Sequence, residues 1–143
     1  MAKFTLDLKK AIEGVEEEAE LVVRGTLLKL SSLIVEGTPV GNPSLWRNPP
    51  PKGYIGGTLR GSWNASISSP DFAKRGVKDK SGAGTIAKIS TVVNGVDLGE
   101  SFYLTNPQPY AARVEFGWSK QRPKGMVRVA LAQVQQALDG ARP

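Results

Sequence analysis

The segment that most resembles a ligand-binding motif is GAGTIA at residues 82–87, which matches the dinucleotide fingerprint G-x-G-x-x-G/A. In dinucleotide-binding proteins this motif follows a strand and opens a helix, because the helix N-terminus binds the pyrophosphate. Here it follows a polar, basic loop and leads into the β-branched run from Thr85 to Val93, which is typical of a strand. We therefore expect a flexible lead-in to a hairpin strand and predict no bound nucleotide.

Carboxylates are the other candidates for catalysis, because the 143 residues include no Cys and no His. That absence excludes a Cys nucleophile, a Ser-His-Asp triad and a thiolate or imidazole metal site. Acid–base catalysis would have to use Asp71, Asp79, Asp97, Glu100, Glu115 and Asp139. Five of these fall in expected loops or at element ends and are interpreted as solvated. Glu115 lies among aromatic residues, and we expect it to form a structural salt bridge or a hydrogen bond at a helix end. No catalytic residue, cofactor or metal is predicted.

Charge is distributed unevenly along the chain, whose formal net charge is +6. Residues 1–36 contain five basic and seven acidic side chains, a net of −2, whereas residues 37–143 contain fourteen basic and six acidic ones, a net of +8. The acidic segment of one copy would attract the basic remainder of the next, which favours head-to-tail association. A contribution to solubility alone is the alternative interpretation.

The basic remainder also raises the hypothesis of nucleic-acid contact. The segment from Pro70 to Gly84 is expected to be a loop, and its four cations are Lys74, Arg75, Lys78 and Lys80. Only Phe72 offers a nearby ring for stacking, so we expect contact with DNA phosphates and not with bases. A solvated loop is the alternative interpretation of these residues.

A long amphipathic helix is expected over residues 1–36. From Asp7 to Val35 apolar residues recur at steps of three and four, the period of one helix face. The opposite face carries a candidate subunit interface made of Glu13, Glu16, Glu17 and Glu20, together with Glu18. A helix of about 29 residues would span roughly 43 Å, longer than a compact body of this size. We therefore expect part of it to overhang and touch a neighbour, with Gly25 as the expected place for a bend.

Residues 37–57 are expected to form an extended arm, because this stretch is rich in Pro and Gly. The triple proline at residues 49–51 favours polyproline geometry. Trp46 and Tyr54 are large apolar anchors in the arm, and we expect them to pack on the body or on a partner subunit. They are therefore further candidates for the subunit interface.

Three or four antiparallel strands are expected between residues 58 and 105. From Leu59 to Ile67 apolar and polar residues alternate, the period of a half-buried strand. The run from Thr85 to Val93 is the expected second strand, and Asn94-Gly95 the hairpin turn to a third strand that includes residues 102–104. A short turn and a C-terminal helix are expected over residues 110–140, the helix opening after Pro123. These elements predict a single α+β domain, residues 1–143.

Three segments, in this order, resemble the tail-completion or neck proteins of long-tailed bacteriophages. They are Thr38-Pro39-Val40, Thr58-Leu59-Arg60-Gly61-Ser62-Trp63 and Tyr110-Ala111-Ala112-Arg113-Val114-Glu115-Phe116-Gly117. In many family members the first two run together as a TPV-D-TG-x-L-R-x-S-W block, whereas here the arm separates them and the Asp is absent. We expect Trp63 to point to the core and Arg60 to the other face. In the third segment we expect the aromatics to anchor a short helical turn to the sheet, with Gly117 permitting a reversal.

The resemblance implies a structural virion protein that forms a ring, taken as a hexamer, between the head connector and the tail tube. The implied partners are further copies of the chain, the head-connector protein, the tail-tube or tail-terminator protein, and genomic DNA passing through the channel. The protein would reside in the virion, and in the host cytoplasm during assembly. Charge alone supports an alternative, a cytoplasmic nucleic-acid-binding module. No membrane segment is expected, and the charges at Asp7, Lys9 and Lys10 argue against a signal peptide.

Overall fold

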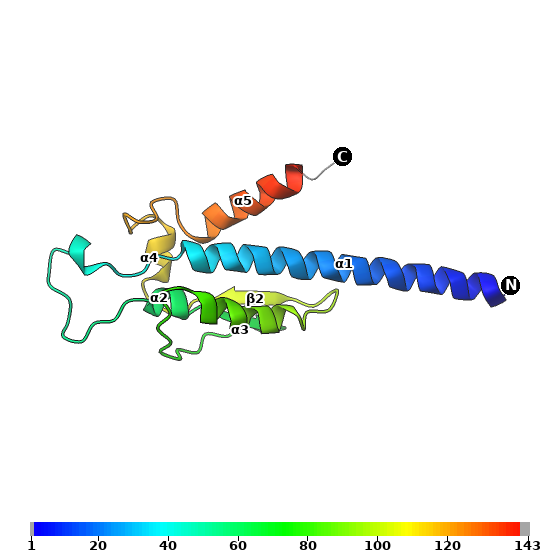
Figure 1. The fold of residues 1–143 in the computed structure, drawn as a ribbon, viewed down its shortest axis with the longest axis horizontal. Helices are drawn as coiled ribbons and strands as arrows, with labels where there is room; N and C mark the ends of the chain where they lie inside the picture. Colours follow the sequence, from blue (N-terminus) through cyan, green and yellow to red (C-terminus); the bar gives the residue numbers. More distant parts are fainter. Residues whose placement is uncertain (1, 141–143) are drawn as a thin grey trace.

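The computed structural model describes the backbone of residues 2–140 and the side chains of residues 9–140. One long helix, α1 (Ala2–Gly37), runs along the molecule, with α5 (Val127–Gly140) on one side and the sheet and α3 on the other (Figure 1). The N-terminal half of α1 projects beyond all the other elements, and the arm extends at the opposite end (Figure 1). The molecule is therefore elongated, with different segments at its two ends.

The predicted N-terminal helix is confirmed, and it continues through Gly25 without a break. At about 1.5 Å per residue, its 36 residues span about 54 Å. Packing stabilises its C-terminal half, where Ile34 and Val35 are buried in the core and both α3 and α5 contact the helix. After the last turn the buried hydroxyl of Thr38 donates a 2.6 Å hydrogen bond back to the carbonyl oxygen of Ile34.

The antiparallel sheet has two strands in the described residues, and the predicted three to four is not confirmed. Strand β1 (Asn64–Ile67) pairs with β2 (Phe102–Thr105), so that Asn64 faces Thr105 and Ile67 faces Phe102. The expected strand from Leu59 instead begins as a helical turn, α2 (Thr58–Gly61). Gly57 causes this difference: its φ of +100° turns the chain, and its carbonyl oxygen accepts a 2.8 Å hydrogen bond from the N–H of Gly61.

The run predicted as the second strand is a helix, α3 (Ala83–Val93), so that prediction was wrong. Its buried residues Thr85, Ile89 and Val93 recur every four positions, which is the period of a helix face. The predicted hairpin at Asn94-Gly95 was wrong as well, because Asn94 is the C-cap of α3 and its N–H bonds back into the last turn. The helix packs against α1, and the chain then returns through a loop to β2.

The predicted C-terminal helix is confirmed as α5, which begins four residues after Pro123. The short turn before it is α4 (Ala111–Glu115). The core lies where the C-terminal half of α1 meets α2, β1, α3 and α5. Its buried apolar side chains are Ile34, Val35, Leu59, Trp63, Ile89, Val93, Val114, Met126 and Ala130.

The predicted arm has one short regular element in it, the 3-10 turn η1 (Pro43–Leu45), and most of its residues are exposed. Trp46 and Tyr54 pack edge to face against each other, with ring centroids 4.9 Å apart. The Tyr54 ring also lies over Gly41, where a Cβ would sit 1.8 Å from the phenol oxygen. The two anchors therefore close the arm into a loop at one end of the molecule.

Candidate assembly surfaces

Thr38, Arg60 and Trp63, from two of the three segments singled out in the sequence, meet at the end of α1. The indole N–H of Trp63 donates a 2.8 Å hydrogen bond to the Thr38 hydroxyl. The guanidinium of Arg60 donates to the carbonyl oxygens of Thr38 (2.7 Å) and Glu36 (3.0 Å), and also to that of Lys80. A cation at the C-terminus of a helix is favourable because the unpaired carbonyls there carry partial negative charge. Burial lowers the pKa of Arg60 from its ordinary value.

Through these contacts the residues of the first two segments stabilise the fold. Trp63 is buried in the core, as predicted, while Arg60 crosses from α2 to the end of α1. Leu59 is buried, and its carbonyl oxygen accepts a 2.9 Å hydrogen bond from the side-chain amide of Asn106. Ser62 donates to the carbonyl oxygen of Thr58. Pro39 and Val40 are half-buried where the arm leaves the body.

Glu115 caps α5, which confirms the predicted hydrogen bond at a helix end. One carboxylate oxygen accepts from the N–H groups of Met126 (2.7 Å) and Val127 (2.8 Å), and the other accepts from the N–H of Arg128 (3.0 Å). Burial alone would raise the pKa of Glu115, but these hydrogen bonds together hold it below its ordinary value. Gly125 leaves room for the carboxylate, since a Cβ there would lie 2.8 Å from it.

The third segment differs from the prediction in where its aromatics point. Phe116 is 76% exposed and Tyr110 is also exposed, so they do not anchor α4 to the sheet. The buried residue of α4 is Val114, which fills the core in their place. Gly117 does permit the predicted reversal: its φ is +90°, and a Cβ would lie 2.6 Å from the carbonyl oxygen of Pro123.

The glycine-rich motif does open a helix, contrary to the prediction, because Gly82 is the N-cap of α3 with a φ of +82°. The N-terminus of that helix is already occupied by a carboxylate of the chain itself. Asp79 accepts hydrogen bonds from the N–H groups of Gly82 (2.9 Å) and Thr85 (2.8 Å) and from the Thr85 hydroxyl (2.8 Å). Burial alone would raise the pKa of Asp79, but these hydrogen bonds lower it overall. A pyrophosphate would have to displace Asp79, so the motif gives no support to nucleotide binding.

The loop after β1 carries Lys74, Arg75, Lys78 and Lys80, and we call it the basic loop. Three of these cations are free of ion pairs among the described residues, and the fourth holds the loop together. Lys74, Lys78 and Lys80 are exposed, and no ion pair joins them to a carboxylate in the described part of the chain. Arg75 instead pairs with Asp71 (2.8 Å) and donates to the side-chain oxygen of Asn64 (3.0 Å). Of the four loop cations, Lys74, Lys78 and Lys80 are therefore the ones that no carboxylate holds among the described residues, and these three can contact a phosphate.

The acidic surface of α1 lies on its projecting half. Arg24 marks where that half begins, because its guanidinium donates to the carbonyl oxygen of Val96 (2.8 Å) and pairs with Glu20 (3.5 Å) and Asp97 (3.4 Å). Glu20 is thus committed within the subunit. Exposed carboxylates remain further toward the N-terminus, at Glu13, Glu16, Glu17 and Glu18.

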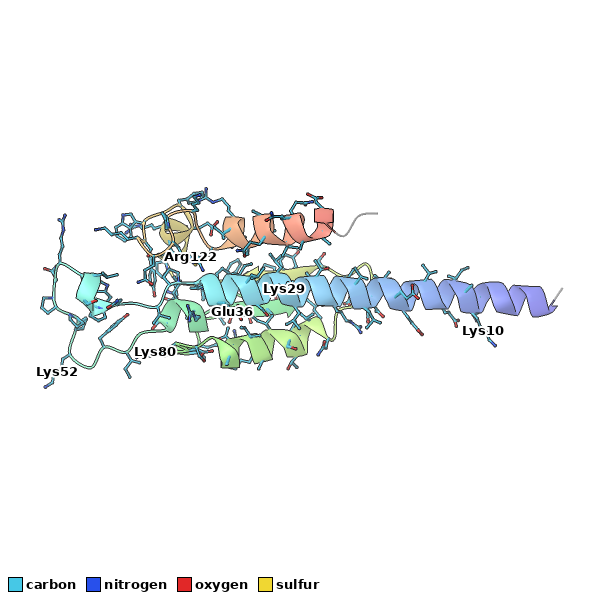
Figure 2. All side chains as sticks on the ribbon, turned by 45° about the horizontal axis from the view of Figure 1, so that its top comes forward. Lys10, Lys29, Glu36, Lys52, Lys80 and Arg122 are labelled. Atoms are coloured by element: carbon cyan, nitrogen blue, oxygen red, sulfur yellow. The ribbon has the colours of Figure 1, made fainter. Side chains whose placement is uncertain are left out.

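The opposite end of the molecule is basic and aromatic. Trp118 is 72% exposed, and the guanidinium of Arg113 lies 5.2 Å from its ring centroid. Arg128 lies 5.2 Å from the centroid of Phe116 in the same way. Figure 2 shows Lys52 and Arg122 at this end and Lys10 far away on the projecting half of α1. Sequence reasoning missed Trp118 and the exposure of Phe116, although aromatics interleaved with basic residues over 113–128 were the available signal.

Comparisons with family models, with curated proteins and with solved structures gave no match to this chain. Within residues 2–140, no helix combines the length and the apolar character needed to cross a membrane. Among the described side chains, no three His, Cys, Asp or Glu residues are grouped so that they could hold a metal ion. The exposed charged and aromatic residues gather at the two ends of the molecule and in the basic loop.

Proposed function

We propose that this protein is a structural subunit of a long-tailed phage virion, a tail-completion or neck protein whose copies form a ring between the head connector and the tail tube. The observation that supports this most directly is the projecting half of α1. An isolated helical segment is marginally stable in water, and most helices in proteins depend on tertiary packing. A segment of this length that packs against no other element among the described residues is suited to contact a neighbouring subunit.

The contact in the ring joins unlike ends. Glu13, Glu16 and Glu17 on the projecting half of one subunit face the basic end of the next subunit, where Lys52 and Arg122 lie (Figure 2). Exposed Lys120 comes two residues before Arg122 in the chain and belongs to the same end. This arrangement is heterologous and closes when the rotation between subunits completes a circle, as in a hexamer. Exposed ion pairs contribute only about 0–1 kcal/mol each, so charge sets the register and the encounter rate. Exposed aromatics such as Trp46 and Trp118 supply the apolar contact.

The contacts of the three sequence segments support a structural role. Arg60 and Trp63 each donate a hydrogen bond to Thr38, and Arg60 also donates to the end of α1. Glu115 caps α5. The polar groups of these four side chains are therefore engaged in hydrogen bonds inside the fold. Such a use of the polar groups supports a protein that acts by assembly.

Deletion of the gene from the phage or prophage that carries it tests this function. Electron microscopy of the resulting particles should show DNA-filled heads and separate tails, and supplying the protein from a plasmid should restore joined particles. Antibody labelling of normal virions should place the protein at the neck. Normal yields of joined, infectious particles without the gene would overturn the proposal.

The three exposed lysines of the basic loop favour a second candidate, a nucleic-acid-binding module. The same experiment separates the two functions. A protein that is absent from purified virions, but binds duplex DNA at physiological salt, would have the second function and not the first.

A further inference from the structure

The projecting half of α1 has an apolar face that is distinct from its acidic one. Ile12 (51% exposed), Val15 (67%) and Val22 (65%) lie on it together with Ala19. Their steps of three and four residues place them in one stripe along the helix. Glu13, Glu16 and Glu17 lie about a quarter to half a turn away from the stripe, at about 100° per residue. We call this stripe, residues 12–22, the ridge.

An apolar groove continues the ridge along the same face of α1. It opens where α5 diverges from α1 toward its C-terminus (Figure 1), and its volume is about 520 Å³. Its walls are Val22 and Leu33 from α1 and Val134 and Leu138 from α5, and Gly25 lies in it without a side chain. The single charged residue among its lining is Lys29.

Because α1 is one continuous helix, its ridge cannot fold back into its own groove, so any cover for the two surfaces comes from another chain. We infer that the second chain is another copy of this protein, in a two-fold dimer whose α1 helices run antiparallel. The ridge and the groove lie on one face of one helix. An antiparallel copy therefore places its ridge in the first groove while its own groove receives the first ridge, and both apolar surfaces are buried by a single contact.

The register follows from matching the ridge to the groove. Placing Ile12 opposite Leu33 of the second copy also places Ala19 opposite Thr26, so that small residues meet where the helices are closest. The two Val22 side chains then lie beside the two-fold axis. In an antiparallel pair the residue numbers of two opposing positions add to a constant. Ile12 with Leu33 and Ala19 with Thr26 give the same sum, so both pairs fit one register.

Charge complementarity selects the same arrangement. Glu18 and Lys29 are eleven residues apart, close to three helical turns, and therefore lie on the same flank of the contact face. In a two-fold antiparallel pair, the equivalent flanks of the two helices lie side by side. Glu18 of each copy therefore lies beside Lys29 of the other, which gives two ion pairs. A parallel pair would instead bring the acidic segments of the two copies together. The dimer uses the apolar face of the projecting half, whereas the proposed ring contact uses its acidic face. An experiment can therefore contradict one of these two contacts without contradicting the other.

A single introduced cysteine tests the dimer, because the chain has none of its own. Val22→Cys should cross-link to itself under mild oxidation, since the two side chains meet at the axis. Glu17→Cys is the matched control, since residue 17 is also exposed in the same segment but lies on the other side of the helix. Cross-linking of the first and not the second, at micromolar protein, is expected. Equal cross-linking of both, or none of Val22→Cys, would overturn the inference.

Charge exchange tests the register. Glu18→Lys and Lys29→Glu should each raise the dimer dissociation constant about tenfold, because each disrupts both symmetric pairs, whereas the double variant should return to within about threefold of the wild type. Sedimentation equilibrium measures these constants, and circular dichroism checks that every variant keeps its helix content. A wild-type chain that stays monomeric at all concentrations would overturn the dimer and assign the ridge to a different protein. A double variant as weak as the single variants would overturn the antiparallel register.

Discussion

Trp63 and Thr38 lie 25 positions apart in the chain, yet the indole N–H of Trp63 donates a 2.8 Å hydrogen bond to the Thr38 hydroxyl inside the core. The same hydroxyl donates to the carbonyl oxygen of Ile34 at 2.6 Å. It therefore acts as donor and acceptor at once, in a place where both side chains are buried. Buried polar groups need such partners, so this hydroxyl joins the end of α1 to the start of β1.

Thr38→Val keeps the shape of this side chain and removes its hydroxyl. We expect the free energy of unfolding to fall by about 1–3 kcal/mol, because the buried Trp63 N–H is left without its acceptor. Urea denaturation followed by tryptophan fluorescence measures this change. Thr91→Val is the control, since its hydroxyl bonds back within α3 at the surface, and it should change stability by less than about 0.5 kcal/mol. Equal losses in the two variants would contradict a buried role for Thr38.

Glu115→Gln should destabilise the protein in a pH-dependent way. Hydrogen bonds to backbone N–H groups hold the folded-state pKa of Glu115 below its ordinary value. The stability that it contributes is therefore present above the unfolded pKa of about 4.3, and is lost as the pH falls through the folded pKa. At pH 7 we expect the variant to be about 1–2 kcal/mol less stable, as for loss of a helix cap.

Urea denaturation of both proteins across the acid range measures this dependence. The difference in unfolding free energy between wild type and variant should shrink as the pH falls below about 4, because the unfolded wild-type chain then binds a proton at Glu115 that the folded protein does not yet bind. Other carboxylates titrate in both proteins and largely cancel in the difference. A difference that stays constant down to pH 2 would show that charge at this position does not stabilise α5.

Neutralising the free lysines of the basic loop should weaken DNA binding without changing its sequence preference. For Lys74, Lys78 and Lys80 changed together to Gln, the slope of log affinity against log salt should fall by about 2–3, since each phosphate contact contributes about 0.9. Fluorescence anisotropy with duplex DNA at several salt concentrations measures this. Lys9 and Lys10 changed to Gln on the projecting helix are the control. An unchanged slope of log affinity against log salt would show that these lysines are solvated and do not contact phosphate.

Arg75 should behave differently from its three neighbours. Its ion pair with Asp71 and its bond to Asn64 hold the loop against β1, so Arg75→Gln should loosen the loop. We expect faster proteolysis within residues 70–80 and little change in the salt slope of DNA binding. A loss of slope equal to that of a single lysine would show that Arg75 contacts phosphate as well.

Reversing the acidic face of the projecting helix should block ring assembly while leaving the subunit folded. Glu13, Glu16 and Glu17 are the residues to change to Lys, and Glu20 is left intact because it pairs with Arg24. Particle assembly in an extract that lacks the native protein measures the effect, and acidic substitutions at Lys52 and Lys120 should rescue it. If the triple variant joined heads to tails at the normal rate in both low and moderate salt, the electrostatic contact would be wrong.

Several elements could be predicted from the sequence because their signals are local. The three- and four-residue period of the first segment predicts α1, and the Pro-rich composition predicts the arm. The aromatics around Glu115 and the glycine that follows them predict a structural salt bridge or a hydrogen bond at a helix end. Each of these inferences uses residues that are near one another in the chain.

The segment from Thr85 to Val93 could not be assigned in this way. Its β-branched residues favour a strand, and its buried positions equally fit a helix face, so the sequence leaves the two patterns in competition. Asp79, which lies outside the segment, decides the start of α3 by capping it. Likewise, nothing local shows that Phe116 points outward while Val114 fills the core.

Tertiary packing therefore decided the sheet, α3 and the relation of Thr38 to Trp63. Secondary-structure preferences differ by less than about 1 kcal/mol per ordinary residue. Burying a side chain such as Ile89 or Val93 against α1 contributes about 1.5–3 kcal/mol. Where local preference and burial disagree, burial contributes more free energy and decides the conformation, and it depends on residues that only the folded chain brings together.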